Sequence, residues 1–272
     1  MYSEILVPLD GSAMSARSLP VAVALGAAMS SPVKAVSIAP PGGEDERSAM
    51  IDAQVEGLAG VTAEVVTTDA AVADVLGEMI AENPGTLACI STVGHSHTGA
   101  ALGSTSEGLL QRTYGPLVLV GPSCNTEFTL SGSILATVDG SDFSEAAVPV
   151  ATAWAVAFGL DVEIIEVHDP DAGSAFRSTG GADVGSESGH VQSIASDVRR
   201  ELGRDVNFEV LHNRHAEHAI VEHALASKAA LLAMATHGKS GLGRLVLGSV
   251  TMATVHRAPC PVITIRPPDL GD

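Results

Sequence analysis

The chain repeats itself, and this repeat limits the possible folds more than any other feature. The segment ILVPLDGS at 5–12 recurs as ILATVDGS at 134–141, an offset of 139 − 10 = 129 residues. Ser15 then matches Ser144, and Pro20 matches Pro149. Each copy is an apolar run, an Asp-Gly-Ser and an alanine-rich stretch, which predicts a strand, a tight turn and a helix. Two domains of one architecture are therefore expected.

The ends of the two copies also correspond. Residues 91–122 and 235–267 each contain a glycine-rich loop, a Gly-Ser, a helical stretch, a proline and an apolar β-rich run. We place the first domain at 1–122 and the second at 132–268. The segment 123–131 is polar and lacks periodicity, so it is predicted to be the linker.

Strands and helices alternate within each copy, and this predicts a parallel, doubly wound α/β sheet. The segments 134–138, 162–167, 206–211, 229–235 and 262–266 read as strands. Helices are expected at 144–159, 189–202, 216–227 and 249–256. The segment 169–189, rich in Gly, Ser and Asp, reads as a loop.

Composition excludes several classes of protein. The 272 residues carry a net charge of −18 and no basic run, so a nucleic-acid binder is not expected. The longest apolar stretch, around 20–29, is too short to span a bilayer. Three cysteines far apart in sequence favour free thiols in a reducing compartment. The N-terminus has no signal-peptide pattern, so we expect a cytoplasmic protein without membrane contact.

The stretch from Ala235 to Ser249 contains Gly238-Lys239-Ser240, the end of a P-loop motif. A P-loop also requires a glycine at position 233, which is alanine here, so this interpretation fails. Instead, Gly238 follows a strand, and Gly248-Ser249 begins a helix after nine intervening residues. Glycine lets the backbone approach an anion, and a helix N-terminus offers free N–H donors, with Ser249 as the expected N-cap.

Asp139 follows the first strand of the second copy, so its carboxylate should open onto the same sheet edge, where it suits ribose hydroxyls. Each residue alone is also compatible with a simple turn or helix start. The full order of Asp-Gly-Ser, Thr-His-Gly, nine residues and Gly-Ser is much more specific. In this order the chain resembles a tandem universal stress protein over nearly its whole length. That family carries a first-strand Asp and the signature Gly-x2-Gly-x9-Gly-Ser/Thr.

The resemblance implies two flavodoxin-like domains, Rossmann-like and of the adenine nucleotide alpha hydrolase-like kind, each with a five-stranded parallel sheet. It implies that the second domain binds ATP, alone or with Mg²⁺. Asp139 would contact ribose, the Val167 backbone would meet adenine, and the signature loop would wrap the phosphates. The implied phosphate-site residues are Ala235, which replaces the first glycine of the signature, Gly238, Lys239, Gly248, Ser249 and Val250.

The first copy departs further from the signature. Only eight residues separate Gly94 from Gly103-Ser104, and Val93 stands where the second copy has His237. A shortened loop shifts its donors, and small displacements are costly in such sites. We expect a weaker site, or one that takes a smaller ligand, with Asp10, Gly94, Gly103 and Ser104 as its residues.

No metal site is predicted. His95 and His97 have no third ligand nearby, and isolated His pairs are weak metal signals. The group of His212, His215, His218 and His223 is interpreted as a solvated helix start, because a Cys or carboxylate partner is missing. Arg214 is interpreted as a surface charge. Lys239 and Arg244 lie in the second signature loop of an acidic chain, which suggests a place beside a triphosphate, and the alternative is that both are surface charges without a fixed partner. Nothing resembles a nucleophile elbow, and no catalytic base is identifiable.

The leading hypothesis is an adenine-nucleotide-binding stress-response sensor or regulator. One alternative is a slow ATPase of the same fold; another is a structural or interaction protein whose sites stay empty. The last strands of both copies, 117–120 and 262–266, would lie at sheet edges, and unpaired edges are a liability. The resemblance therefore implies an internal pseudo-dimer, and two chains could form a homodimer.

Overall fold

The computed structural model describes residues 2–94, 102–170, 188–237 and 247–266. Two compact units divide the chain, Met1–Leu130 and Ser131–Asp272. No helix or strand occupies the segment between β5 and β6, 121–132. The domain limits of 1–122 and 132–268, with a linker at 123–131, remain a prediction.

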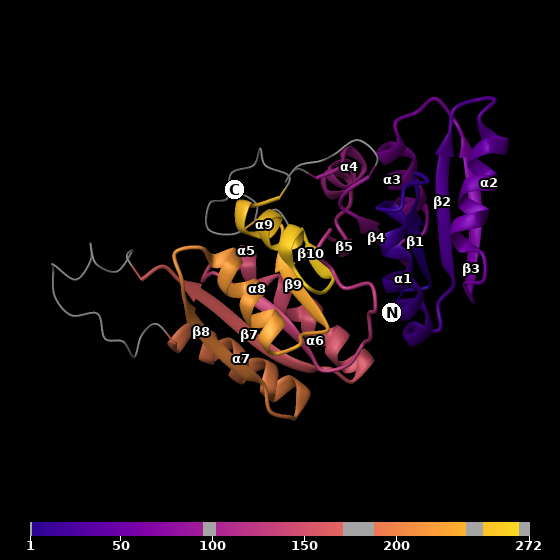
Figure 1. The fold of residues 1–272 in the computed structure, drawn as a ribbon. Helices are drawn as coiled ribbons and strands as arrows, with labels where there is room; N and C mark the ends of the chain where they lie inside the picture. Colours follow the sequence, from indigo (N-terminus) through magenta and orange to yellow (C-terminus); the bar gives the residue numbers. More distant parts are fainter. Residues whose placement is uncertain (1, 95–101, 171–187, 238–246, 267–272) are drawn as a thin grey trace. The chain divides into compact units, whose positions relative to one another are not determined.

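The first unit alternates strands and helices from its start (Figure 1). Its strand order is β3-β2-β1-β4-β5, and all four pairings are parallel. The strands are β1 (Glu4–Pro8), β2 (Val33–Ala39), β3 (Val61–Thr67), β4 (Thr86–Ser91) and β5 (Leu117–Val120). The helices are η1 (Ser15–Arg17), α1 (Ser18–Met29), α2 (Glu44–Val55), α3 (Val72–Glu82) and α4 (Ser104–Arg112).

The second unit repeats this architecture with the parallel order β8-β7-β6-β9-β10. Its strands are β6 (Ser133–Val138), β7 (Asp161–His168), β8 (Asn207–His212), β9 (Leu231–Ala235) and β10 (Val262–Ile265). Its helices are α5 (Asp142–Glu145), α6 (Ala147–Phe158), α7 (Gly189–Leu202), α8 (Ala216–Ala226) and α9 (Ser249–Arg257). Two five-stranded parallel sheets, one in each unit, confirm the predicted fold class.

Right-handed crossovers explain how the helices cover each sheet. In the second unit the chain moves from β6 outward to β8 and then returns across β6 to β9. Helices α6 and α7 therefore cover one face and pack on each other, while α8 and α9 pack together on the other (Figure 1). Strands covered on both faces are apolar throughout, as in β9, where all five residues are buried.

One predicted helix differs from the observed structure. The stretch 144–159 was expected to be continuous, but the structure has α5 followed by α6. The Ser141 side chain accepts a hydrogen bond from the Ser144 amide, so helical structure already begins at Asp142. The second helix ends at Gly159, whose φ of 67° is the left-handed conformation that ends many helices.

Candidate nucleotide site

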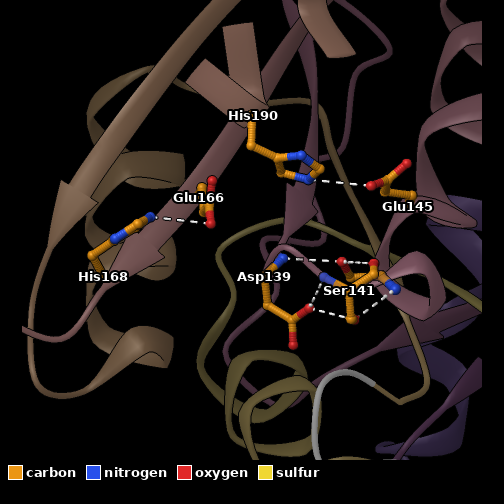
Figure 2. Close-up of polar contacts among 7 residues, drawn as sticks. Asp139, Ser141, Glu145, Glu166, His168 and His190 are labelled. Atoms are coloured by element: carbon orange, nitrogen blue, oxygen red, sulfur yellow. Dashed lines mark hydrogen bonds and ion pairs between the residues drawn. The ribbon is translucent and has the colours of Figure 1, made fainter. Parts of the chain in front are cut away.

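The turn after β6 is built by the Asp-Gly-Ser sequence itself. Gly140 has a φ of 77°, a conformation that glycine adopts at no steric cost. The chain then turns back, so that the Ser141 amide and hydroxyl both donate to Asp139 Oδ1, at 3.1 and 2.5 Å (Figure 2). Asp139 in turn donates its amide to Ser144 Oγ at 3.0 Å. The carboxylate is thus held in one orientation by local contacts.

The first unit contains the same turn. Gly11 has a φ of 84°, and Asp10 Oδ1 accepts from the Ser12 amide at 2.9 Å and from the Ser12 hydroxyl at 2.6 Å. The Asp10 amide donates to Ser15 Oγ at 3.3 Å, which corresponds to the contact of Asp139 with Ser144. The sequence repeat therefore reproduces a hydrogen-bonding arrangement residue by residue.

The start of the last helix is also built alike in both units. The Gly248 amide donates to the Thr236 carbonyl at 2.6 Å, and the Thr251 hydroxyl donates to the Ala235 carbonyl at 3.0 Å. These bonds hold the start of α9 against the end of β9. In the first unit Gly103 and Ser106 make the corresponding bonds to Thr92 and Ser91, at 2.9 and 3.1 Å.

The expectation that Ser249 is the N-cap of this helix is wrong. The helix begins at Ser249, so Gly248 occupies the N-cap position, and no side chain of the described residues caps the helix. Gly103 precedes α4 in the same way, again without a side-chain cap. A glycine cap has no side-chain oxygen to bind the first helical N–H groups, which remain oriented toward a possible ligand.

One cavity of the second unit brings together most of the predicted residues. Its volume is about 260 Å³, and it lies where β6, β7 and β9 end and α9 begins. Its wall includes the predicted residues Asp139, Val167, Ala235, Gly248, Ser249 and Val250. Val167 was expected to end its strand, but β7 continues to His168. Gly238, Lys239 and Arg244 lie outside the described residues.

Apolar residues that the sequence analysis did not identify complete this cavity. Ala216 and Ile220 come from α8, and Met234 comes from β9. Such side chains are ordinary in a ligand site, where a few polar groups orient the ligand within mostly apolar walls. No local sequence signal could have assigned them to a ligand site, because the helices and strands of this fold contribute apolar side chains to the core along their length.

The first unit has a smaller cavity, of about 160 Å³, in the corresponding place. All four predicted residues, Asp10, Gly94, Gly103 and Ser104, line it. A Cβ on Gly94 would lie 2.6 Å from Asp10 Oδ2, so the backbone passes closely over the carboxylate. Arg47 of α2 also lines the cavity and donates to the Asp10 carbonyl at 2.7 Å. Sequence reasoning missed Arg47, which belongs to no motif.

Two carboxylate–imidazole pairs lie near the Asp139 turn. His168 Nε2 is 3.0 Å from Glu166 Oε1, and His190 Nε2 of α7 is 3.1 Å from Glu145 Oε1 of α5 (Figure 2). Glu166 is only 5% exposed, and within the described ranges its Oε2 has no hydrogen-bond partner. Glu166 alternates with Val167 along β7, so its side chain leaves the sheet on the opposite face. None of these four residues lines the cavity of the second unit.

The histidines of the 212–223 region divide into exposed and partly buried groups. The His215 and His218 side chains are 66% and 46% exposed, in keeping with a solvated helix start. The same interpretation is wrong for His223, whose side chain is 15% exposed and lies 2.9 Å from Glu163 Oε1. His223 follows the buried Ile220 by about one helical turn, so it faces the sheet. His95 and His97 lie outside the described residues.

The buried thiols lie apart from both cavities. Burial raises the pKa of Cys124 to about 11, an effect that the nearby Arg17 guanidinium partly offsets, and burial raises the pKa of Cys89 still further. Neither thiol lines a described cavity, and each is expected to be inert because the thiolate is the reactive form.

In the described part of the chain, no helix is both long and apolar enough to cross a bilayer.

Comparison with known proteins agrees with this architecture. The model of the universal stress protein family matches residues 131–266, half of the chain. A universal stress protein of Methanocaldococcus jannaschii is 34% identical over 140 residues, which cover 50% of this chain and 82% of the relative. One from Thermus aquaticus is 28% identical over 134 residues, covering 49% of this chain and 98% of the relative.

A solved structure extends the likeness to both units. The crystal structure of a universal stress protein from Archaeoglobus fulgidus matches with a TM-score of 0.67 and 17% sequence identity. The match covers 98% of this chain and 97% of that one, so the two share a fold over their full length. On the family match, the close relative and the repeated architecture, this chain belongs to the universal stress protein family.

Proposed function

We propose that the second unit binds an adenine nucleotide, with ATP as the leading candidate, and that the protein acts as a stress-response sensor or regulator. The observation that carries most weight is the single cavity at the carboxyl ends of β6, β7 and β9. It combines the Asp139 carboxylate with the uncapped start of α9. In open α/β sheets, ligands bind in this position.

Each group has a distinct role in this proposal. Asp139 accepts hydrogen bonds from ribose hydroxyls, because its carboxylate is held at the cavity wall by Ser141. The first amides of α9, at Ser249 and Val250, donate to phosphate oxygens, assisted by the helix dipole. Val167 on β7 lies beside the adenine. Gly238 and Lys239 would complete the phosphate contacts, as the family signature implies.

Nucleotide binding can be tested by calorimetry on the full chain. Asp139→Ala removes an acceptor whose hydrogen bonds, being to a charged group, are each worth about 1.5–3 kcal/mol. We expect the ATP affinity of the second unit to fall about tenfold to a hundredfold. Asp10→Ala is the matched control and should leave that affinity unchanged. Equal effects of the two substitutions would contradict the assignment to the second unit.

Mass spectrometry of ligand released from purified protein would identify the nucleotide directly. Titrations with ATP, AMP and cAMP would rank the nucleotides. If no nucleotide is released and ATP produces no heat, the protein is better described as a structural or interaction protein with empty sites. Lys239→Ala tests the signature loop of the second unit. If this variant binds ATP as tightly as the wild type, Lys239 is not part of the nucleotide site.

A slow ATPase is the second candidate. Asp139 beside a ribose would be too far from the γ-phosphate to act as a base, so we expect phosphate release to be slow or absent. Steady-state phosphate release by the wild type and by Asp139→Ala distinguishes the candidates, since turnover that disappears in the variant would favour an enzyme.

The smaller cavity of the first unit is proposed to take a smaller ligand or to bind nucleotide weakly.

A further inference from the structure

A cluster of two carboxylates and one imidazole lies between β7, β8 and α8, apart from the residues that line the second-unit cavity (Figure 1 shows the three elements). Glu163 Oε1 is 2.9 Å from His223 Nε2, and Glu209 Oε2 is 3.7 Å from His223 Nδ1. One ligand atom from each of the three side chains lies within 4.8 Å of the others.

The fold holds two of these side chains firmly. Glu163 pairs with Asn207 in the parallel register of β7 and β8, so Glu209, two residues further along β8, projects from the same sheet face. His223 reaches this face from α8. The Glu163 and His223 side chains are each 15% exposed, whereas Glu209 is 53% exposed and free to adjust its rotamer.

The repeat provides an internal comparison at the same place in the first unit. Adding the offset, 34 + 129 = 163, makes Lys34 the counterpart of Glu163. Lys34 pairs with Thr62 in the register, and two residues further on Glu64 forms an ion pair with Lys34 at 2.5 Å. The eighth residue of α3 is Met79, where α8 has His223. The first unit thus has a self-neutralising Lys–Glu pair, while the second has two acids and an imidazole.

Among the described residues, no lysine or arginine forms an ion pair with the second-unit cluster. In the described part of the chain, the only ion-pair partner of Glu163 and of Glu209 is His223. Two acidic side chains brought together with a single imidazole leave a local excess of negative charge, in a chain whose net charge is already −18. A bound divalent cation would remove this excess, as Lys34 does for Glu64 in the first unit.

We propose that Glu163, Glu209 and His223 bind a divalent transition-metal ion, of which Zn²⁺ is the representative. One imidazole nitrogen and two carboxylate oxygens form a donor set typical of such ions, and three protein ligands leave a position open to water. Ligand bonds of about 2.0–2.2 Å at a tetrahedral angle place nitrogen and oxygen about 3.4 Å apart. The 2.9 Å separation joins Glu163 to His223 Nε2, whereas the 3.7 Å separation joins Glu209 to Nδ1, so one ion can use only one of the two nitrogens. One ligand atom from each side chain already lies within 4.8 Å of the others. Binding through Nε2 therefore requires a small opening of the Glu163–His223 contact and a rotamer change that brings the exposed Glu209 toward Nε2.

The test uses the full chain after removal of metal by a chelator. Zn²⁺ is titrated by calorimetry, and bound zinc is counted by elemental analysis after dialysis. The wild type should bind one ion through this cluster, and His223→Gln should weaken that binding at least tenfold. Glu163→Lys is the decisive variant, because it recreates the Lys–Glu pair of the first unit. It should keep its thermal stability without metal while losing the site and the increase in Tm that Zn²⁺ gives the wild type.

His218→Gln is the matched control, since it removes an exposed histidine from the same helix and should leave zinc binding unchanged. Zinc binding by Glu163→Lys equal to that of the wild type would overturn the proposal. So would a loss of binding in His218→Gln but not in His223→Gln, which would place the ion elsewhere. A wild type that binds no Zn²⁺ would leave the cluster as an ion-pair network only. The nucleotide titration with Asp139→Ala is independent of all these outcomes.

Discussion

Replacing Ser141 with alanine should loosen the carboxylate that we assign to ribose, and the repeat supplies a control for this substitution. The Ser141 hydroxyl donates to Asp139 Oδ1 at 2.5 Å and accepts from the Ser144 amide at 3.3 Å. The substitution removes both bonds but keeps the Ser141 amide bond to Asp139 at 3.1 Å. Of the two hydrogen bonds that Ser141 donates to the Asp139 carboxylate, one therefore remains.

The expected magnitude follows from these contacts. Loss of a side-chain N-cap costs about 1 kcal/mol, and the lost hydroxyl–carboxylate bond adds less than its buried value because the turn is partly exposed. The second unit should become less stable by about 1–2 kcal/mol. Without the Ser141 hydroxyl bond, the Asp139 carboxylate is less ordered in the free protein. Ordering it when the nucleotide binds costs conformational entropy, so we expect ATP affinity to fall about threefold to tenfold.

Ser12→Ala removes the equivalent bonds in the first unit, at 2.6 and 3.0 Å. It should cause a similar loss of stability, measured by calorimetric unfolding, without changing ATP affinity in the second unit. The reasoning is refuted if both substitutions weaken ATP binding equally. It is also refuted if Ser141→Ala destabilises the protein as expected but leaves ATP affinity unchanged, because the turn would then have no part in the site.

Two further predictions concern stability. Gly26→Ala places a methyl group 2.8 Å from the Ser31 carbonyl oxygen, so we expect a loss of about 1–3 kcal/mol in urea unfolding. The comparison is Gly159→Ala, which meets no atom within 4 Å but has a φ of 67°, and should cost about 1 kcal/mol through backbone strain alone. Burial raises the pKa of the Cys124 thiol in the folded protein to about 11, above its ordinary value of 9.0, so unfolding releases a proton at high pH. Its contribution to stability should be complete below about pH 9 and disappear as the pH rises toward about 11, and Cys124→Ala should flatten that part of the stability–pH profile.

The sequence alone was enough to predict the repeat, the two parallel α/β units and the residues of the turns. The reason is that these features depend on neighbours in the chain. Apolar runs and their spacing indicate strands and helices, and the helix predicted at 189–202 is observed as Gly189–Leu202. The Asp-Gly-Ser turn closes on itself within six residues, from Asp139 to Ser144. Because parallel strands end at one sheet edge, the topology then places Asp139 near the start of α9.

Only the tertiary structure identified the groups that approach from elsewhere in the chain. Arg47 reaches the Asp10 turn from α2, and His223 meets Glu163 although 60 residues separate them. The histidine spacing along α8 pointed to neighbouring histidines and gave no sign of the carboxylates on β7 and β8. Local patterns determine which elements form, because they record each segment's own periodicity. Strand register and helix packing determine which distant side chains meet, because those contacts arise only when the elements assemble.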